Sequence, residues 1–246
     1  MMIPAALRGV RGVVLDTDGV ITDSARPHAE AWKRAFDAFL AEHPPARPEQ
    51  RRPFDVRADY LRYVDGKSRL DGAASFLASR GLDLPARTVA AVAADKERIF
   101  TDRLREGGID AYPGTVRLLH ALREDAIPLA AASASRHARE LLLHAGVLPL
   151  FDALVDGAEV ARLGLVGKPD PALFVEAARR LGVTAADAAV VEDALAGVEA
   201  GRRGGFRVVI GVDRNATDGT RADLLRHGAD IVVEDLGELL VEDGKS

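Results

Sequence analysis

Residues 13–20 read VVLDTDGV. Residues 13–15 end an apolar stretch that begins at Val10. Asp16, Asp18 and Gly19 lie directly after this stretch. A short apolar run bounded by turn residues predicts a buried β-strand, and Gly19 predicts a loop after it. We therefore expect Asp16 and Asp18 to lie at the carboxyl end of a buried strand.

The same pattern of a strand followed by a polar loop recurs after residue 110. Apolar runs predict strands at 127–132, 154–155, 188–191, 207–212 and 231–233, and helical patterns lie between them at 113–123, 136–144, 171–181 and 194–201. This alternation predicts a Rossmann-like α/β fold, in which helices cover both faces of a parallel sheet. The carboxyl ends of the strands then meet at one edge, which is where such sheets bind ligands.

Residues 23–108 show no strand pattern. Helices are expected at 28–40, 75–79 and 89–104, and an irregular loop rich in proline and arginine is expected at 42–53. We therefore predict an α/β catalytic core formed by residues 1–22 and 109–246. Residues 23–108 are expected to form a helical cap domain, inserted after the first strand and covering the site. Trp32, Phe36 and Phe39 are expected in the core of this cap rather than in a stacking site for a ligand.

The composition limits the possible partners. The 246 residues carry a formal net charge of −5 and contain no cysteine. A nucleic-acid partner usually needs a basic face, and a chain without cysteine has neither disulfides nor thiolate metal sites and suits a reducing compartment. No apolar run is long enough to cross a membrane, and residues 1–11 lack the pattern of a signal peptide. We expect a cytoplasmic monomer that binds neither nucleic acid nor membrane.

Asp16 and Asp18 suit two complementary tasks in phosphoryl transfer. One carboxylate can attack phosphorus and form an aspartyl phosphate. The other can give a proton to the leaving oxygen and take one from the incoming group. A plain surface turn is an alternative, since Asp and Gly are common in turns. A calcium-binding loop is excluded, because Val20 fills a ligand position and Pro27 stands where the closing glutamate would be.

Glu192 and Asp193 follow another predicted strand. Together with Asp16 they would offer the oxygen ligands that Mg²⁺ prefers, and the cation would reduce the repulsion between the nucleophile and the phosphate. Asp193 could instead cap the helix that begins at Ala194. The two roles can coexist.

Ser133 and Lys168 are candidates for binding a phosphate. A hydroxyl next to free backbone N–H groups can form an anion-binding cradle, and a simple helix N-cap at Ser133 is the alternative. Lys168 could pair with the phosphate and with Asp16, and a solvated loop lysine is the alternative.

Residues 66–68 (GKS) resemble the end of a Walker A loop, which binds nucleotide phosphates. The match is rejected, because Leu61 stands where that motif has its first glycine.

The order of these segments resembles the haloacid dehalogenase superfamily of phosphotransferases. Its four motifs correspond here to residues 13–20, Ala131-Ala132-Ser133, Lys168-Pro169 and Glu192-Asp193. Within the superfamily the chain is similar to the β-phosphoglucomutase group. The segments that carry this similarity are Asp16 to Ser24 with His28 and Trp32, Tyr112-Pro113-Gly114, Ser133-Ala134-Ser135 and residues 167–171 (GKPDP).

The resemblance implies a role for each candidate residue. Asp16 is the nucleophile and Asp18 the general acid/base. The resemblance places Mg²⁺ on Asp16, the carbonyl of Asp18 and Asp193, with Glu192 beside them. The residues that it places around the transferring phosphoryl group and the sugar phosphate are Ser133, Ala134, Ser135 and Lys168 in the core, and His28, Gly66, Arg69 and Lys96 in the cap. Among these, His28 is a hinge residue, and Arg69 grips the distal phosphate with its planar fork.

The reaction implied by the resemblance converts β-glucose 1-phosphate to glucose 6-phosphate through a bound bisphosphate. Two positions depart from the group's pattern, because Asp65 stands where the pattern has a lysine and Gly72 where it has a serine. A phosphatase that acts on a small phosphorylated metabolite with the same core residues is the first alternative. A catalytically silent binding protein is the second, and it is disfavoured because the chain keeps all of the motif acids and the lysine.

Overall fold

The computed structural model describes residues 4–106, 109–214 and 218–240 of the chain. The chain divides into two compact units. We call Met1–Asp23 with Ile109–Ser246 the α/β unit, and Ser24–Gly108 the helical unit. The ends of the predicted core domain, residues 1–3 and 241–246, lie outside the described residues.

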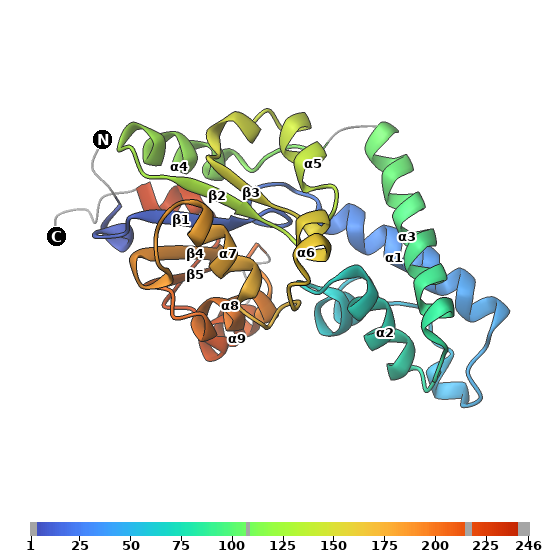
Figure 1. Ribbon diagram of the computed structural model, residues 1–246. Coiled ribbons are helices and arrows are strands. Elements are labelled where there is room, and N and C mark those ends of the chain that lie inside the picture. Colours follow the sequence, from blue (N-terminus) through green and yellow to red (C-terminus); the bar gives the residue numbers. More distant parts are fainter. Residues whose placement is uncertain (1–3, 107–108, 215–217, 241–246) are drawn as a thin grey trace. The chain divides into compact units, whose positions relative to one another are not determined.

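The described part of the α/β unit is built on a six-stranded parallel sheet with the order β3-β2-β1-β4-β5-β6 (Figure 1). Its strands are β1 (Gly12–Asp16), β2 (Leu129–Ala132), β3 (Ala153–Val155), β4 (Ala188–Glu192), β5 (Val208–Val212) and β6 (Ile231–Val233). This confirms the predicted fold class. Because β1 lies between β2 and β4, the carboxyl ends of these three strands are adjacent.

Helices cover both faces of this sheet (Figure 1). They are α4 (Pro113–Glu124), α5 (Ala138–His144), α6 (Gly157–Leu163), α7 (Ala172–Arg180), α8 (Leu195–Arg203) and α9 (Asp218–His227), with 3-10 turns at Ala5–Leu7, Leu148–Leu150, Ala185–Asp187 and Leu236–Leu240. Successive strand residues point to opposite faces, so Val13 and Leu15 pack in one hydrophobic cluster with α4 and α5, while Val14 packs in the other with α7, α8 and α9.

The helical unit consists of α1 (Ala25–Glu42), α2 (Arg69–Ser79) and α3 (Ala86–Glu106), with a 3-10 turn at Pro48–Gln50 and a π-helical turn at Tyr60–Val64. No strand forms between residues 24 and 106. Its core is aromatic, as predicted for Trp32 and Phe36: the ring centroid of Phe36 lies 4.7 Å from that of Trp32 and 4.1 Å from that of Phe76.

The proline- and arginine-rich loop is fixed to the helical unit by a buried carboxylate. Asp59 receives hydrogen bonds from Arg52, from Arg80 and from the backbone N–H of Asp55. Burial alone would raise the pKa of Asp59, but these hydrogen bonds more than offset it and hold the pKa below its usual value. Because Arg80 and Asp59 are both almost fully buried, this ion pair replaces solvent as the partner of each charge.

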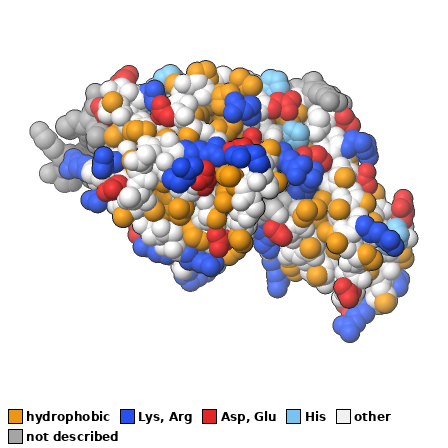
Figure 2. Space-filling model, viewed as in Figure 1, with side chains coloured by type: hydrophobic (Ala, Val, Ile, Leu, Met, Phe, Trp, Pro, Cys, Tyr) orange, Lys and Arg blue, Asp and Glu red, His pale blue; other side chains and the backbone are white. Residues whose placement is uncertain are grey.

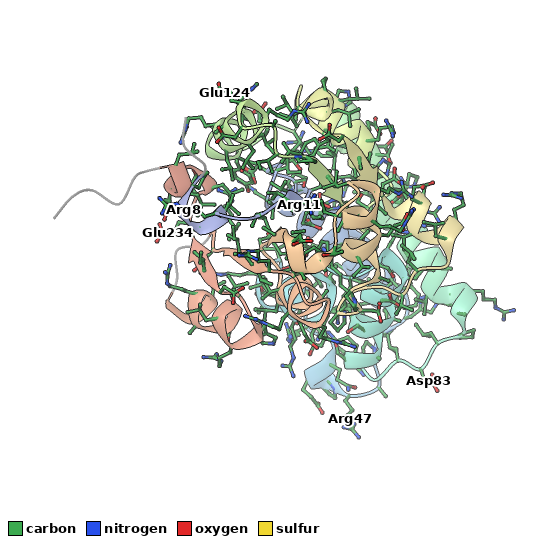
Figure 3. The ribbon with its side chains drawn as sticks, turned by 60° about the vertical axis from the view of Figure 1, so that its left-hand side comes forward. Arg8, Arg11, Arg47, Asp83, Glu124 and Glu234 are labelled. Atoms are coloured by element: carbon green, nitrogen blue, oxygen red, sulfur yellow. The ribbon has the colours of Figure 1, made fainter. Side chains whose placement is uncertain are left out.

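Charged side chains lie on the outside of both units, interspersed with hydrophobic and uncharged ones (Figure 2). Arg47 and Asp83 of the helical unit and Glu124 of the α/β unit are exposed and extend away from the ribbon (Figure 3). On the α/β unit, basic and acidic side chains stand next to each other (Figure 2). Among the described residues, no helix combines the length and the apolar character needed to cross a bilayer.

Several helices differ from the sequence expectations. Helix α2 begins at Arg69, where Ser68 caps it by accepting a hydrogen bond from the N–H of Asp71, six residues before the predicted start. Helices α6 and α9 were not predicted. α6 has only seven residues, and its start depends on the cap that Asp156 provides by accepting from the N–H groups of Ala158 and Glu159. Short helices carry too few apolar residues for a periodic pattern to stand out.

Candidate active site

Three strand ends bring the predicted core residues together. Asp16 ends β1, Glu192 ends β4, and Ser133 directly follows β2. In the sheet register Asp16 is opposite Ala132, and Leu15 is opposite Val191. The pairing of parallel neighbours therefore places the two acids and the hydroxyl side by side, although 176 positions separate Asp16 from Glu192 (192 − 16).

Lys168 joins the two acids. Its ammonium nitrogen lies 2.6 Å from Oδ1 of Asp16 and also donates a hydrogen bond to Oε1 of Glu192. The side chain of Lys168 is only 2% exposed, so the alternative of a solvated loop lysine is wrong. Burial alone would lower the pKa of Lys168, but the carboxylates of Asp16 and Glu192 outweigh burial and raise it. The two carboxylates therefore favour the charged form of the lysine.

Asp16 has a strongly perturbed environment. Burial raises the pKa of its carboxyl group, the charge of Lys168 lowers it, and the neighbouring carboxylates of Glu192 and Asp18 raise it again, with a net shift well above the usual value. Its second oxygen, Oδ2, accepts a hydrogen bond of 3.0 Å from the N–H of Asp18. The single positive charge of Lys168 therefore does not balance the negative charges of the carboxylates around Asp16.

These acids fit a divalent cation. Asp16, Glu192 and Asp193 each offer a carboxylate oxygen, and the three oxygens lie within 4.8 Å of one another. Three carboxylates and one ammonium leave a surplus of two negative charges, which a divalent ion with oxygen ligands would balance.

Glu192 differs from the other two acids in its contacts. Its Oε1 accepts from Lys168, and its Oε2 accepts from the N–H groups of Asp193 and Ala194 at 2.6 and 2.7 Å. Glu192 thus binds the backbone at the start of α8, whose N-cap residue is Ala194. The simple N-cap alternative for Asp193 is therefore wrong.

The loop after β2 has its own supports. Oγ of Ser133 accepts from the N–H of Ser135 at 3.0 Å, and the N–H of Gly157 donates to the carbonyl of Ser135 at 3.0 Å. Helix α5 begins only at Ala138, so Ser133 is not its N-cap. A Cβ at position 157 would lie 2.4 Å from the carbonyl oxygen of Ala134, and the loop therefore packs directly on Gly157.

Gly19 lets the loop after β1 approach Asp193. Its φ of +77° lies in the left-handed region, and a Cβ there would stand 1.8 Å from Oδ2 of Asp193. Both the backbone conformation and the contact therefore require a residue without a side chain.

Gly19→Ala is expected to weaken Mg²⁺ binding at least about tenfold, because the new methyl group displaces a carboxylate of the acid cluster. Gly182→Ala is the matched control: Gly182 has a φ of +73° but nothing within 4 Å of the added Cβ, so it isolates the backbone strain. Calorimetric titration with Mg²⁺ measures the effect. Equal affinity in the two variants would show that the Gly19–Asp193 contact is irrelevant to the metal.

The helical unit brings two of its predicted residues together. Nζ of Lys96 lies 2.7 Å from Nδ1 of His28, and both side chains are buried. The ring of His28 stacks on Phe100 at 3.8 Å, and Lys96 lies over the same ring. The pair connects α1 to α3.

Arg69 is the first residue of α2, and Gly66 lies three residues before it. Arg69 forms an ion pair of 3.2 Å with Glu97, which the sequence did not suggest. A phosphate that binds Arg69 would have to compete with this carboxylate. Asp65, the first departure from the group's pattern, follows the π-helical turn directly. Gly72, the second, is buried against that turn, where an added Cβ would lie 3.4 Å from Cα of Val64.

Arg214 was missed by the sequence analysis. It follows β5 by two residues, at the same edge of the sheet as Asp16, and donates hydrogen bonds to the carbonyls of Gly19 and Val20. A cationic side chain just past the predicted strand at 207–212 is the signal that could have drawn attention to it.

The fold and the acid–lysine cluster define an enzyme, because a binding module has no need of buried, mutually repelling carboxylates at the ligand-binding edge of its sheet. Residues 10–205 match the family described as haloacid dehalogenase-like hydrolase. The chain belongs to this family, which confirms the resemblance read from its motifs.

Individual relatives extend over almost the whole chain. It is 43% identical over 240 residues to a protein of Mycobacterium bovis named beta-phosphoglucomutase, covering 94% of this chain and 92% of that protein. It is 32% identical over 241 residues to beta-phosphoglucomutase of Bacillus subtilis, covering 95% of this chain and 93% of that protein. Among solved structures, a hydrolase from Pseudomonas syringae superposes with a TM-score of 0.76 at 26% identity, covering 94% of this chain and 96% of that chain.

Proposed function

We propose that this protein is a Mg²⁺-dependent phosphomutase that converts β-glucose 1-phosphate to glucose 6-phosphate through an aspartyl phosphate on Asp16. The observation that carries the proposal is the buried cluster in which Lys168 contacts both Asp16 and Glu192 at the carboxyl edge of the sheet. The names of the Mycobacterium bovis and Bacillus subtilis relatives support the choice of substrate.

In the first half of the reaction, the phosphoryl group moves from Asp16 to the 6-hydroxyl of the sugar. The hydroxyl oxygen forms the new bond to phosphorus, the bond from phosphorus to the Asp16 carboxylate breaks, and Asp18 takes the hydroxyl proton. The resulting bisphosphate then reorients in the site, so that its 1-phosphate faces Asp16. A carboxylate oxygen of Asp16 then attacks the 1-phosphate, and Asp18 returns the proton to the leaving O1.

The remaining residues of the α/β unit hold the charges in place. Lys168 keeps one oxygen of Asp16 oriented and offers its ammonium to the phosphoryl oxygens, and the loop of Ser133, Ala134 and Ser135 adds N–H and hydroxyl donors. Asp16, the carbonyl of Asp18 and Asp193 would hold Mg²⁺, with Glu192 fixing Lys168 beside them. When bound, the cation supplies charge that offsets the repulsion between carboxylate and phosphate.

The helical unit is proposed to act as the cap domain. Residues 23–108 would provide His28, Gly66, Arg69 and Lys96 to the sugar phosphate, with Arg69 as the partner of the distal phosphate. Exclusion of water by this cap would keep the aspartyl phosphate from hydrolysis, so that it reacts with a sugar hydroxyl.

The products distinguish the mutase from the second candidate. With β-glucose 1-phosphate, Mg²⁺ and a trace of glucose 1,6-bisphosphate, we expect glucose 6-phosphate to accumulate without a matching release of inorganic phosphate. Coupled detection of glucose 6-phosphate and a colorimetric phosphate assay on the same sample measure both. Free phosphate in an amount equal to the substrate consumed would reject the mutase.

A phosphatase is the second candidate, and one observation favours it. Arg69 is already paired with Glu97, which opposes the binding of a second phosphate and so suits a substrate with a single phosphate. The family description and the name of the Pseudomonas syringae neighbour also refer to hydrolases. In this candidate water takes the place of the sugar hydroxyl, while Asp16 and Asp18 keep their tasks.

Removal of the metal is expected to abolish turnover, and Asp193→Asn is expected to weaken Mg²⁺ binding by about 100-fold, since changing even an indirect partner of a metal ligand costs 10- to 100-fold. Calorimetric titration of the metal-free protein measures the affinity without reference to activity. Asp187→Asn is the control, because Asp187 precedes the opposite, amino end of β4. Unchanged Mg²⁺ affinity in Asp193→Asn would remove this residue from the metal site.

A further inference from the structure

We propose that Arg214 is a positioning residue for Asp18: it fixes the loop of residues 17–22, which carries this carboxylate, in the geometry needed for proton transfer. The inference rests on the proposed function, in which Asp18 is the general acid/base. Arg214 comes from the opposite end of the α/β unit's sequence, just after β5, and its side chain is only 16% exposed.

The loop after β1 is closed by its own backbone. The N–H groups of Ile21 and Thr22 both donate to the carbonyl of Thr17 at 2.9 Å, and the N–H of Gly19 donates to the carbonyl of Thr22 at 2.9 Å. Asp18 lies inside this closed loop, directly before Gly19. The conformation of the loop therefore sets the position of the Asp18 carboxylate.

Arg214 holds the outer side of the same loop. Its Nε donates to the carbonyl of Gly19 at 3.0 Å, and its Nη2 donates to the carbonyl of Val20 at 3.1 Å. Only a planar guanidinium can reach two successive carbonyl oxygens in this way, because its N–H groups point out in a fixed fork. A lysine would replace the charge but not the geometry.

The guanidinium is itself held on its other sides. It stacks on the ring of Tyr112 at 3.7 Å, and its Nη1 donates to Oδ2 of Asp235 at 3.0 Å. Thr115 receives a weaker bond of 3.3 Å from Nη2 and in turn donates to the carbonyl of Val20 at 2.8 Å. Arg214 therefore connects the loop to α4 and to the segment after β6, both of which belong to the α/β unit.

Tyr112 also fixes the end of the loop segment. Its hydroxyl donates to Oδ1 of Asp23 at 3.0 Å. Burial, and then the charge of Asp23, raise the pKa of Tyr112, which favours the protonated hydroxyl that donates to Asp23. The stacked pair of Arg214 and Tyr112 thus binds the chain at three points after Asp18: Gly19, Val20 and Asp23.

The leaving group of the substrate provides the test. An alkoxide leaving group, as in a sugar phosphate, depends on a proton from Asp18, whereas nitrophenolate leaves with little need of one. If Arg214 acts through Asp18, Arg214→Met lowers kcat on β-glucose 1-phosphate by about 100-fold, within the range of general acid catalysis. It lowers the rate of the initial nitrophenolate burst from 4-nitrophenyl phosphate, which reports the phosphorylation of Asp16 alone, by less than about threefold, since that step uses little general acid catalysis. Asp18→Asn sets the reference for this selective loss.

Two further variants complete the experiment. Arg202→Met removes an arginine that likewise binds a loop carbonyl and an aspartate, Gly228 and Asp230, on the surface, and it leaves both rates unchanged. Arg214→Lys keeps the charge and is expected to show the same selective loss as Arg214→Met. If Arg214→Met fails to fold, the rates of Arg214→Lys on the two substrates are compared with those of the wild type instead.

The outcomes separate the inference from the function on which it rests. Equal losses on both substrates, or no loss on either, would overturn the positioning role of Arg214 even if Asp18→Asn is selective. If Asp18→Asn itself shows no selectivity, the general acid assignment fails first, and the proposal for Arg214 falls with it.

Discussion

Asp16→Asn is expected to lower kcat by about 10⁴-fold or more, because an amide cannot attack phosphorus, and removing a nucleophile has costs of this order in other enzymes. The wild-type protein is expected to form a phosphorylated peptide that contains Asp16 when it is quenched in acid during turnover. The variant is expected to form none. Mass spectrometry of the digested protein measures both.

The stability of the same variant gives an independent result. Burial and the neighbouring acids raise the pKa of Asp16, which means that its ionised form costs folding free energy in the absence of a metal. Asp16→Asn is therefore expected to be at least as stable as the metal-free wild type. A folded variant that keeps full turnover would show that Asp16 is not the nucleophile.

Lys168→Met is expected to abolish turnover and, in contrast, to destabilise the protein by about 3–5 kcal/mol, the usual cost of removing one partner of a buried ion pair. The methionine leaves Asp16 and Glu192 buried next to each other with no cation between them. Urea denaturation of the metal-free protein measures the change in the free energy of unfolding.

Lys33→Met provides the comparison for this effect. Lys33 pairs with Asp37 at 2.7 Å and also donates to the carbonyl of Phe54 at 3.0 Å, and its side chain is 41% exposed. Loss of this partly exposed pair and of the hydrogen bond is expected to cost no more than about 2 kcal/mol. If both lysine variants lost the same stability, the ion pairs around Lys168 would have no special energetic role.

Much of the α/β unit could be predicted because its signals are local. The apolar run that ends in Asp16 and the similar runs ending near Ser133 and Glu192 all became strands of the sheet. Parallel topology then requires their carboxyl ends to share one edge. The haloacid dehalogenase motifs could be recognised from the sequence for the same reason, because each motif is a short stretch tied to one strand end.

Other features depended on contacts between distant segments. The helix at Gly157–Leu163 has too short a pattern to be seen, yet Gly157 supports the loop of Ser133. The sequence offered Lys168 as a partner of Asp16, but its second contact, with Glu192, became known only from the structure. The pairing of Arg69 with Glu97 joins two helices of the helical unit, and no local pattern distinguishes it from many other charge pairs.

The sequence by itself determined the strands along the chain, most of the helices between them, the parallel sheet and the identity of the acids at its edge, because hydrophobic periodicity and chain connectivity are properties of neighbouring residues. Only the tertiary structure decided which charges meet. Lys168 lies 152 positions from Asp16, and Arg214 lies 195 positions from Gly19. Electrostatic interaction falls off with distance through space and not along the chain, so the protonation of the cluster and the anchoring of the Asp18 loop follow from packing alone.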